Sequence, residues 1–200
     1  MRETDNDDPG KAEWRARLTA ERTAIPAQQQ VTEAKALTEA VAGLAAGTVC
    51  CYVPFGPEPG SIALLDVLRD RGTRVLLPIV PPRREPLDWA EYTDTSALVQ
   101  GRYRGVLEPS GPRLGAAGVG EADLVLLPAL AVDHQGVRLG RGAGYYDRSL
   151  RFASPSADLI AVIRDTEFVE RLPAEPHDVR MTAVLTPGRG VLRLPYPGRM

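Results

Sequence analysis

Apolar residues recur along the chain with two different periods, and the change between them separates helices from strands. Near the N-terminus, Trp14 and Leu18 lie one helical turn apart among charged residues, which predicts a helix over about residues 11–22. Pro26 suits the first turn of a second helix, and Gly47 suits its end. The apolar stripe expected on this second helix comprises Val31, Ala34, Leu37, Val41 and Leu44.

Beyond the second helix, the apolar runs become short and continuous, which is typical of buried strands. Residues 49–53 form the first such run, and residues 74–78 form the next. Ser61 can cap a helix between them that ends at Gly72, so this stretch predicts a βαβ unit. Later strands are expected at residues 87–92, 123–128, 159–163 and 181–186, helical segments at 145–152 and 168–173, and mostly irregular chain at 81–86 and 101–120.

This alternation predicts an α/β fold: a single three-layer domain over residues 11–200, with a mostly parallel sheet flanked by helices and an N-terminal helical segment. The near-continuous apolar run at 123–128 suits the centre of the sheet. Residues 1–10 are polar and are expected to form a disordered leader.

Composition narrows the choice of partners. The chain has 200 residues, of which 44% are hydrophobic, and a formal net charge of −2. It therefore has no overall attraction to nucleic acid or to a membrane surface, and any anion site must be local. No apolar run approaches the roughly 20 residues that span a bilayer. Cys50 and Cys51 are neighbours that point to opposite faces of a strand, so no disulfide between them is expected. A reducing compartment fits this, and the cytoplasm is the expected location. The expected oligomeric state is a monomer.

A glycine-rich segment soon follows the strand at 123–128, where ligands of parallel sheets bind. Gly140, Gly142 and Gly144 alternate with other residues, and a backbone without Cβ atoms can turn successive N–H groups toward an anion. Arg138, Arg141 and Arg148 could bind phosphate oxygens, and Asp147 could bind Mg²⁺.

Alone, alternating glycines equally indicate a tight turn between strand and helix. The segment has neither the Gly-Lys-Ser/Thr of a Walker A loop nor the spacing of a dinucleotide fingerprint.

The longer string at 127–148 closely resembles the signature of the 5-formyltetrahydrofolate cyclo-ligase family, above all in Arg-Leu-Gly-Arg-Gly-Ala-Gly-Tyr-Tyr-Asp at 138–147. Further matches lie across the chain. They are Lys11 and Arg15 in the first helix, Tyr52 and Glu58 after the first strand, Gly-Val-Leu-Glu-Pro at 105–109, and Pro173 with Asp178 before the last strand.

The resemblance implies an enzyme that uses ATP and Mg²⁺ to cyclise 5-formyltetrahydrofolate to 5,10-methenyltetrahydrofolate, releasing ADP and phosphate. It implies ATP contacts from Lys11, Arg15, Arg138, Leu139, Gly140, Arg141, Gly142, Ala143, Gly144, Tyr145 and Tyr146. It implies folate contacts from Val53, Glu58, Arg141, Gly142, Ala143, Gly144 and Tyr145. Arg141 and Tyr145 would be catalytic, and Asp147 and Asp178 would hold Mg²⁺.

The chain departs from the family pattern at several positions. Ala129 replaces the usual Gly, Val132 replaces Phe, and Ala143 stands where some members have Lys. The Pro-Gly-Ser at 59–61 also differs. These departures bear on the folate contacts more than on the ATP site.

Other interpretations remain open from the residues alone. Glu58 is equally a solvated surface acid, Lys11 and Arg15 equally an exposed helix face, and Asp178 a partner in a surface ion pair. Two other functions would fit a similar frame: a non-catalytic nucleotide- or folate-binding regulator, and a sugar-phosphate isomerase. The remaining assignments are His134 and His177 as structural or exposed, Trp14 as core, and Trp89 and Tyr92 as core or as a rim on which a folate ring could stack.

Overall fold

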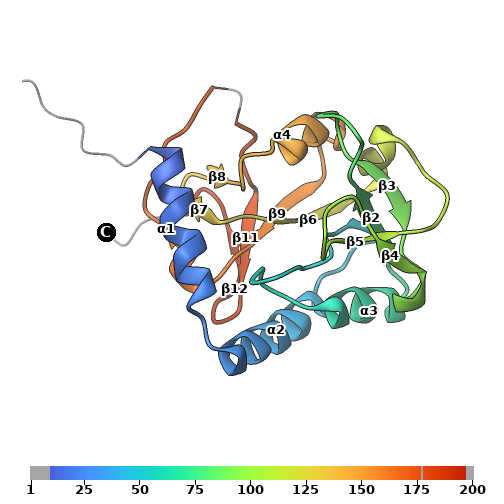
Figure 1. Ribbon diagram of the computed structural model, residues 1–200, viewed down its shortest axis with the longest axis horizontal. Coiled ribbons are helices and arrows are strands. Elements are labelled where there is room, and N and C mark those ends of the chain that lie inside the picture. The colour runs from blue at the N-terminus through green and yellow to red at the C-terminus, as the bar shows by residue number, and fades with distance from the viewer. Residues whose placement is uncertain (1–9, 177, 197–200) are drawn as a thin grey trace, which may run out of the picture.

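A seven-stranded sheet with helices on both faces forms the centre of the computed structural model, which describes residues 10–176 and 178–196 (Figure 1). Five neighbouring strands run parallel, and each edge carries one antiparallel strand. The predicted three-layer α/β fold with a mostly parallel sheet is therefore confirmed. In sheet order, the strands are β12 (Gly190–Arg193), β11 (Ala183–Thr186), β9 (Asp158–Val162), β6 (Leu124–Pro128), β1 (Thr48–Cys50), β2 (Arg74–Ile79) and β3 (Asp88–Glu91).

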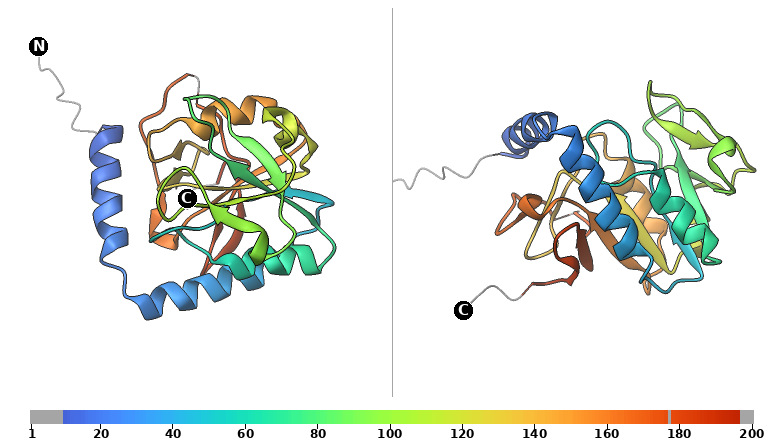
Figure 2. Two further views of the ribbon diagram at one scale, coloured as in Figure 1. Left: turned by 45° about the vertical axis from the view of Figure 1, so that its right-hand side comes forward. Right: turned by 90° about the horizontal axis from the view of Figure 1, so that it is seen from below.

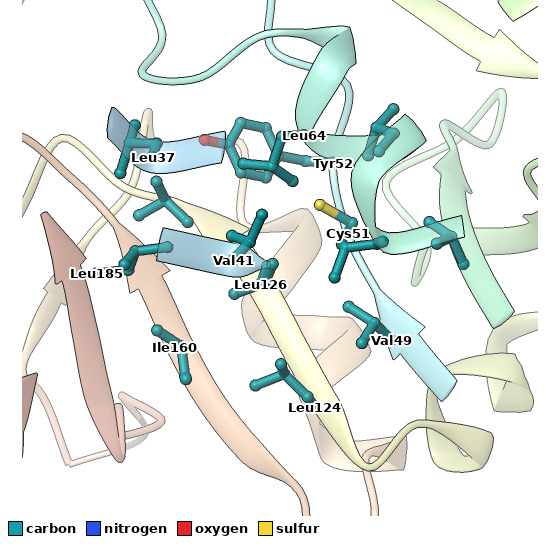
Figure 3. Close-up of a cluster of buried hydrophobic side chains, with 14 of the residues drawn as sticks. Leu37, Val41, Val49, Cys51, Tyr52, Leu64, Leu124, Leu126, Ile160 and Leu185 are labelled. Carbon is teal, nitrogen blue, oxygen red and sulfur yellow. The ribbon is translucent and has the colours of Figure 1, made fainter. Parts of the chain in front are cut away.

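Successive side chains of each central strand alternate between two apolar cores, one on each face of the sheet. Helices α2 (Ala27–Val41) and α3 (Ile62–Asp70) cover one face (Figure 3). Leu124 and Leu126 of β6 point into this core, whereas Val125 between them points into the other. Burial of both faces explains why the central strands show continuous apolar runs.

Short helices cover the opposite face, namely η2 (Ala116–Glu121), α4 (Tyr145–Ser149) and η3 (Leu150–Phe152). Cys50 packs into this core and Cys51 into the core beneath α2, so both thiols are buried and free, as predicted. Trp89 and Tyr92 are also fully buried, which makes them core residues rather than rim residues.

Helix α1 (Lys11–Thr23) stands at the side of the sheet and meets α2 at a sharp bend (Figure 1, Figure 2). Trp14 and Leu18 attach it to a small apolar cluster, which confirms Trp14 as a core residue. The other buried members of this cluster are Leu130, Ala131, Val137, Leu139 and Leu172.

Two expectations for helices were wrong. Residues 168–173 were expected to form a helical turn, but β10 (Phe168–Val169) pairs in parallel with β7 (Ala131–Asp133). The helical turn comes just before, at η4 (Asp165–Glu167). The stripe on α2 also extends less far than predicted, since Val31 is 64% exposed and only the C-terminal half of α2 reaches the core.

Several short elements were not predicted from the sequence. Strand β8 (Arg138–Leu139) pairs with β7 in an antiparallel hairpin, and β12 pairs with β11 at the sheet edge. The predicted irregular chain at 101–120 contains part of a second hairpin. That hairpin and the turn before it are formed by η1 (Thr95–Ala97), β4 (Leu98–Gln100) and β5 (Leu107–Pro109).

Strand β1 marks the point where the chain changes the side on which it adds strands to the sheet. The chain passes from β1 outward to β2 on one side, and later enters β6, β9 and β11 on the other side. The loops that leave β1 and β6 at their carboxyl ends therefore diverge, which opens a crevice at the usual ligand position of such sheets. Within the described residues, no helix is both long and apolar enough to cross a bilayer. The predicted leader, apart from Gly10, lies outside the described residues.

We expect Leu126→Ala to lower the free energy of unfolding by about 2–5 kcal/mol, because Leu126 is fully buried in the central strand and its loss leaves a cavity. Val31→Ala on the exposed part of α2 is the control and should change it by less than about 0.5 kcal/mol. Urea denaturation measures both values. Equal effects of the two substitutions would contradict this assignment of the core.

Candidate functional site

A cavity of about 710 Å³ lies at the carboxyl ends of β1 and β6, and this volume is typical of small-molecule sites. Residues of helix α1 and of the β4–β5 hairpin line it. These two elements lie at opposite sides of the molecule in Figure 1. Every residue that the family resemblance assigned to ATP, folate or magnesium lines this cavity, whereas Arg148, suggested by its charge alone, does not. The structure thus brings together residues that lie up to 167 positions apart in the chain.

The glycine segment forms one wall of the cavity between β8 and α4. Gly142 and Gly144 have φ angles of 96° and 69°, which residues with a side chain rarely adopt. At Gly140, a Cβ atom would approach Arg138 Nη1 to 2.8 Å. Among the described residues, the backbone N–H groups of residues 141–144 donate no hydrogen bond to the protein, so they can bind an anionic ligand.

Arg138 and Asp147 form an ion pair in this wall. Arg138 Nη2 donates to Asp147 Oδ1 at 2.7 Å, and its Nη1 donates to the Pro128 carbonyl at 3.3 Å. The Arg138 side chain is only 5% exposed, whereas that of Asp147 is 41% exposed. The pair therefore holds the carboxylate at the cavity surface, where a ligand or cation can reach it.

Helix α1 contributes two cationic side chains to the cavity. Lys11 Nζ donates to both carboxylate oxygens of Asp178, at 3.2 and 3.0 Å, and also lies 3.5 Å from Glu175. Arg15 Nε donates to the Gly140 carbonyl at 2.9 Å. These contacts place α1 directly against the glycine segment, although α1 lies far from it in sequence.

Glu58 is a buried carboxylate in the loop that follows β1. Its Oε1 lies 3.1 Å from Arg141 Nε, and its Oε2 accepts from the Phe55 N–H at 3.2 Å. Burial raises the pKa of Glu58 above its ordinary value, and the nearby Arg141 offsets this only in part. The Arg141 guanidinium also stacks over the Phe55 ring at 4.7 Å. A partly desolvated carboxylate of this kind suits a hydrogen bond to a polar ligand group.

Two tyrosines meet across the cavity. Tyr145 begins α4, and Tyr103 comes from the loop between β4 and β5. Their hydroxyl oxygens are 3.0 Å apart. This hydrogen bond raises the pKa of Tyr145 and lowers that of Tyr103. The Tyr145 side chain, to which the family resemblance assigns a catalytic role, therefore lies at the cavity wall, and its hydroxyl pairs with that of Tyr103.

The remaining wall, near β2 and β5, is apolar. Its side chains suit a flat organic ring, whereas the opposite wall near α1 suits an anion. These apolar residues are Val53, Val80, Leu87, Val106 and Leu107.

The acidic residues suit a magnesium ion only if a ligand completes its coordination. Within the described ranges, no group of three or more His, Cys, Asp or Glu side chains could hold a metal. Mg²⁺ commonly takes only one or two carboxylates together with substrate phosphates and waters. Asp147 and Asp178 fit that smaller role, but each already has a cationic partner, Arg138 and Lys11 respectively.

His134 does not line this cavity. His134 packs against Phe168 and Tyr196, at ring-centroid distances of 4.7 and 5.5 Å, which confirms its structural role. His177 lies outside the described residues.

Sequence reasoning did not assign several of the lining residues, among them Arg22, Phe55 and Tyr103. A signal for Arg22 was present, because it follows Trp14 and Leu18 at helical spacing on the buried face of α1. No local signal marks Tyr103, since its role depends on a hairpin that the sequence did not predict.

Comparison with known proteins agrees with the motif. Residues 7–187 match the model of the 5-formyltetrahydrofolate cyclo-ligase family. A 5-formyltetrahydrofolate cyclo-ligase of Mycolicibacterium smegmatis is 49% identical, over 92% of this chain and 97% of the relative. One from Escherichia coli K12 is 31% identical, over 84% and 94%. The solution structure of Aquifex aeolicus 5,10-methenyltetrahydrofolate synthetase shares the fold, with a TM-score of 0.77, 24% identity and 95% coverage of both chains.

We expect a carbon-13 NMR titration to give Glu58 a carboxyl pKa above 4.5, and Arg141→Met to raise it further. Because the folded state binds this proton more tightly than the unfolded state, ionising Glu58 costs stability. Glu58→Gln should therefore gain stability relative to the unsubstituted protein as the pH rises from 4.5 through the folded pKa. A Glu58 pKa below 4.5 would contradict the assignment of a desolvated carboxylate.

Proposed function

Because the chain belongs to the 5-formyltetrahydrofolate cyclo-ligase family, we propose that it uses ATP and Mg²⁺ to cyclise 5-formyltetrahydrofolate to 5,10-methenyltetrahydrofolate, releasing ADP and phosphate. One observation carries the proposal. The family motif at 138–147 forms the cationic wall of a single cavity whose other wall is apolar. Such a cavity can hold a nucleoside triphosphate beside a flat heterocycle.

The phosphates of ATP would lie along the glycine segment. The N–H groups of residues 141–144 would bind phosphate oxygens, and Arg138 and Arg141 would add charged donors. Lys11 and Arg15 would approach from α1. Leu139, Gly140, Ala143, Tyr145 and Tyr146 line the same stretch and complete the proposed nucleotide contacts.

Asp147 and Asp178 would hold Mg²⁺ together with the bound phosphates. When bound, the metal offsets the negative charge of the phosphates during transfer. Arg138 and Lys11 hold the two carboxylates in position until then.

The folate would lie against the apolar wall with Val53. Glu58 would accept hydrogen bonds from its polar ring edge, and the Tyr145 hydroxyl would face the reacting formyl group. Arg141 pairs with Glu58 and also belongs to the glycine segment, so it would connect the two substrates.

The reaction needs activation of an otherwise poor leaving group. The formyl oxygen attacks the γ-phosphorus and releases ADP. N10 then bonds to the formyl carbon and loses its proton, and the C–O bond breaks to release phosphate, which takes up that proton. Arg141 would stabilise the transferring phosphoryl group, which makes it the catalytic cation. The mechanism needs no protein nucleophile, because the substrate oxygen attacks directly.

A first experiment follows the absorbance of 5,10-methenyltetrahydrofolate in purified protein with 5-formyltetrahydrofolate and Mg²⁺, with and without ATP. We expect a rise only with ATP. Ligand binding without ADP release would instead indicate a regulatory relative, and turnover of a sugar phosphate without ATP would indicate an isomerase. The predicted cytoplasmic location and monomeric state can be tested by fractionation and by sedimentation.

We expect Asp147→Asn to fold normally and to lower kcat at least about 10²-fold, because it removes a metal ligand at the phosphates. Asp70→Asn replaces an acid whose side chain is 65% exposed outside the cavity, and it should leave kcat unchanged. Steady-state kinetics over a range of Mg²⁺ concentrations measure both. Normal turnover of the Asp147 variant would remove that residue from the metal site.

A further inference from the structure

A chain of buried charges links α1 to the loop that carries Glu58. Arg22, at the end of α1, is 2% exposed. Its Nε and Nη2 donate to the two carboxylate oxygens of Glu167 at 2.6 and 2.7 Å, and Nη2 also donates to the Ala129 carbonyl at 2.5 Å. Because two hydrogen bonds join the two groups, the orientation of the Arg22 guanidinium plane is fixed, whereas a single contact at the surface would leave it free to rotate.

Glu167 also contacts Arg164. Glu167 Oε2 accepts from the Arg164 backbone N–H at 2.8 Å, and its Oε1 lies 3.7 Å from Arg164 Nη1. Arg164 is itself buried, and its Nε donates to Glu33 of α2 at 2.7 Å. Two cations and two carboxylates thus balance one another inside the protein.

The connection ends beside the proposed folate contact. Arg164 Nη1 donates to the carbonyl of Pro57 at 3.0 Å, and Pro57 directly precedes Glu58. Glu58 in turn pairs with Arg141 of the glycine segment. One continuous series of contacts therefore runs from Arg22, which itself lines the cavity, to the loop that carries Glu58.

Helix α1 depends heavily on this anchor. Its buried side chains are Trp14, Leu18 and Arg22, while Lys11 and Arg15 reach the cavity from its other end. Lys11 and Arg22 are about 16 Å apart at the helical rise per residue, so a small tilt at Arg22 moves Lys11 appreciably.

We propose that Arg22, Glu167 and Arg164 are positioning residues that couple the α1 side of the cavity to the Glu58 loop, so that the nucleotide and folate subsites share one support. This inference rests on the proposed function for the identity of the two ligands. Disturbing the Arg22–Glu167 pair must then affect both subsites, although Arg22 belongs to α1 alone.

The test uses Arg22→Met with Glu167→Gln in one protein. Both charges leave together, so no unpaired buried charge remains, and glutamine can still accept from the Arg164 N–H. The matched control is Arg17→Met with Glu21→Gln, which makes the same changes in an exposed ion pair of the same helix. Circular dichroism and thermal unfolding establish that each protein is folded.

Calorimetry measures the Kd of ATP with Mg²⁺ and of 5-formyltetrahydrofolate separately, each without the other ligand. We expect both Kd values to rise about tenfold in the Arg22–Glu167 variant and to stay unchanged in the control. A rise for ATP alone, or for neither ligand, would overturn the proposed coupling.

Amide hydrogen exchange without ligands tests the coupling independently of the reaction, and so separates its failure from a failure of the proposed function. We expect faster exchange in residues 11–23 and in 52–58 together. Faster exchange in α1 alone overturns the inference. If the double variant does not fold, Glu33→Ala removes the α2 carboxylate that accepts from Arg164 Nε, and exchange at 52–58 must again increase.

Discussion

The parallel pairing of β1 with β6 is the constraint on which the site depends. It joins two halves of the sheet that the chain builds in opposite directions, and it places the loops after β1 and β6 side by side. One loop brings Glu58, and the other leads through the β7–β8 hairpin to the glycine segment. Without this register, the carboxylate and Arg141 would lie on separate parts of the molecule.

Much of the fold could be predicted because its strands are buried on both faces and its long helices are amphipathic. The run at β6 and the turn residues around α3 carry their structure in local sequence. The short strands β7, β8 and β10 could not be predicted in this way. Each exists only because a distant partner supplies its hydrogen bonds, and Phe168–Val169 has no local pattern that distinguishes it from a helical turn.

Prediction of the site shows the same division between features encoded in local sequence and features that depend on distant segments. The motif at 138–147 pointed to the glycine segment, and the family resemblance pointed to Lys11, Glu58 and Asp178, all of which line one cavity. The individual roles of these residues stay predictions. Neither route gave Arg22 or Tyr103, because a buried cation and a hairpin tip acquire meaning only when the chain segments that meet them are known.

The separation of 145 positions in sequence from Arg22 to Glu167 also bears on how the protein is made. Helix α1 leaves the ribosome early, but the carboxylate that holds it is synthesised after β9, when most of the sheet can already have formed. The contact between Arg22 and Glu167 therefore cannot form until most of the chain has been made. The α1 side of the cavity can thus be fixed in place only late in synthesis, although α1 itself is made before the sheet.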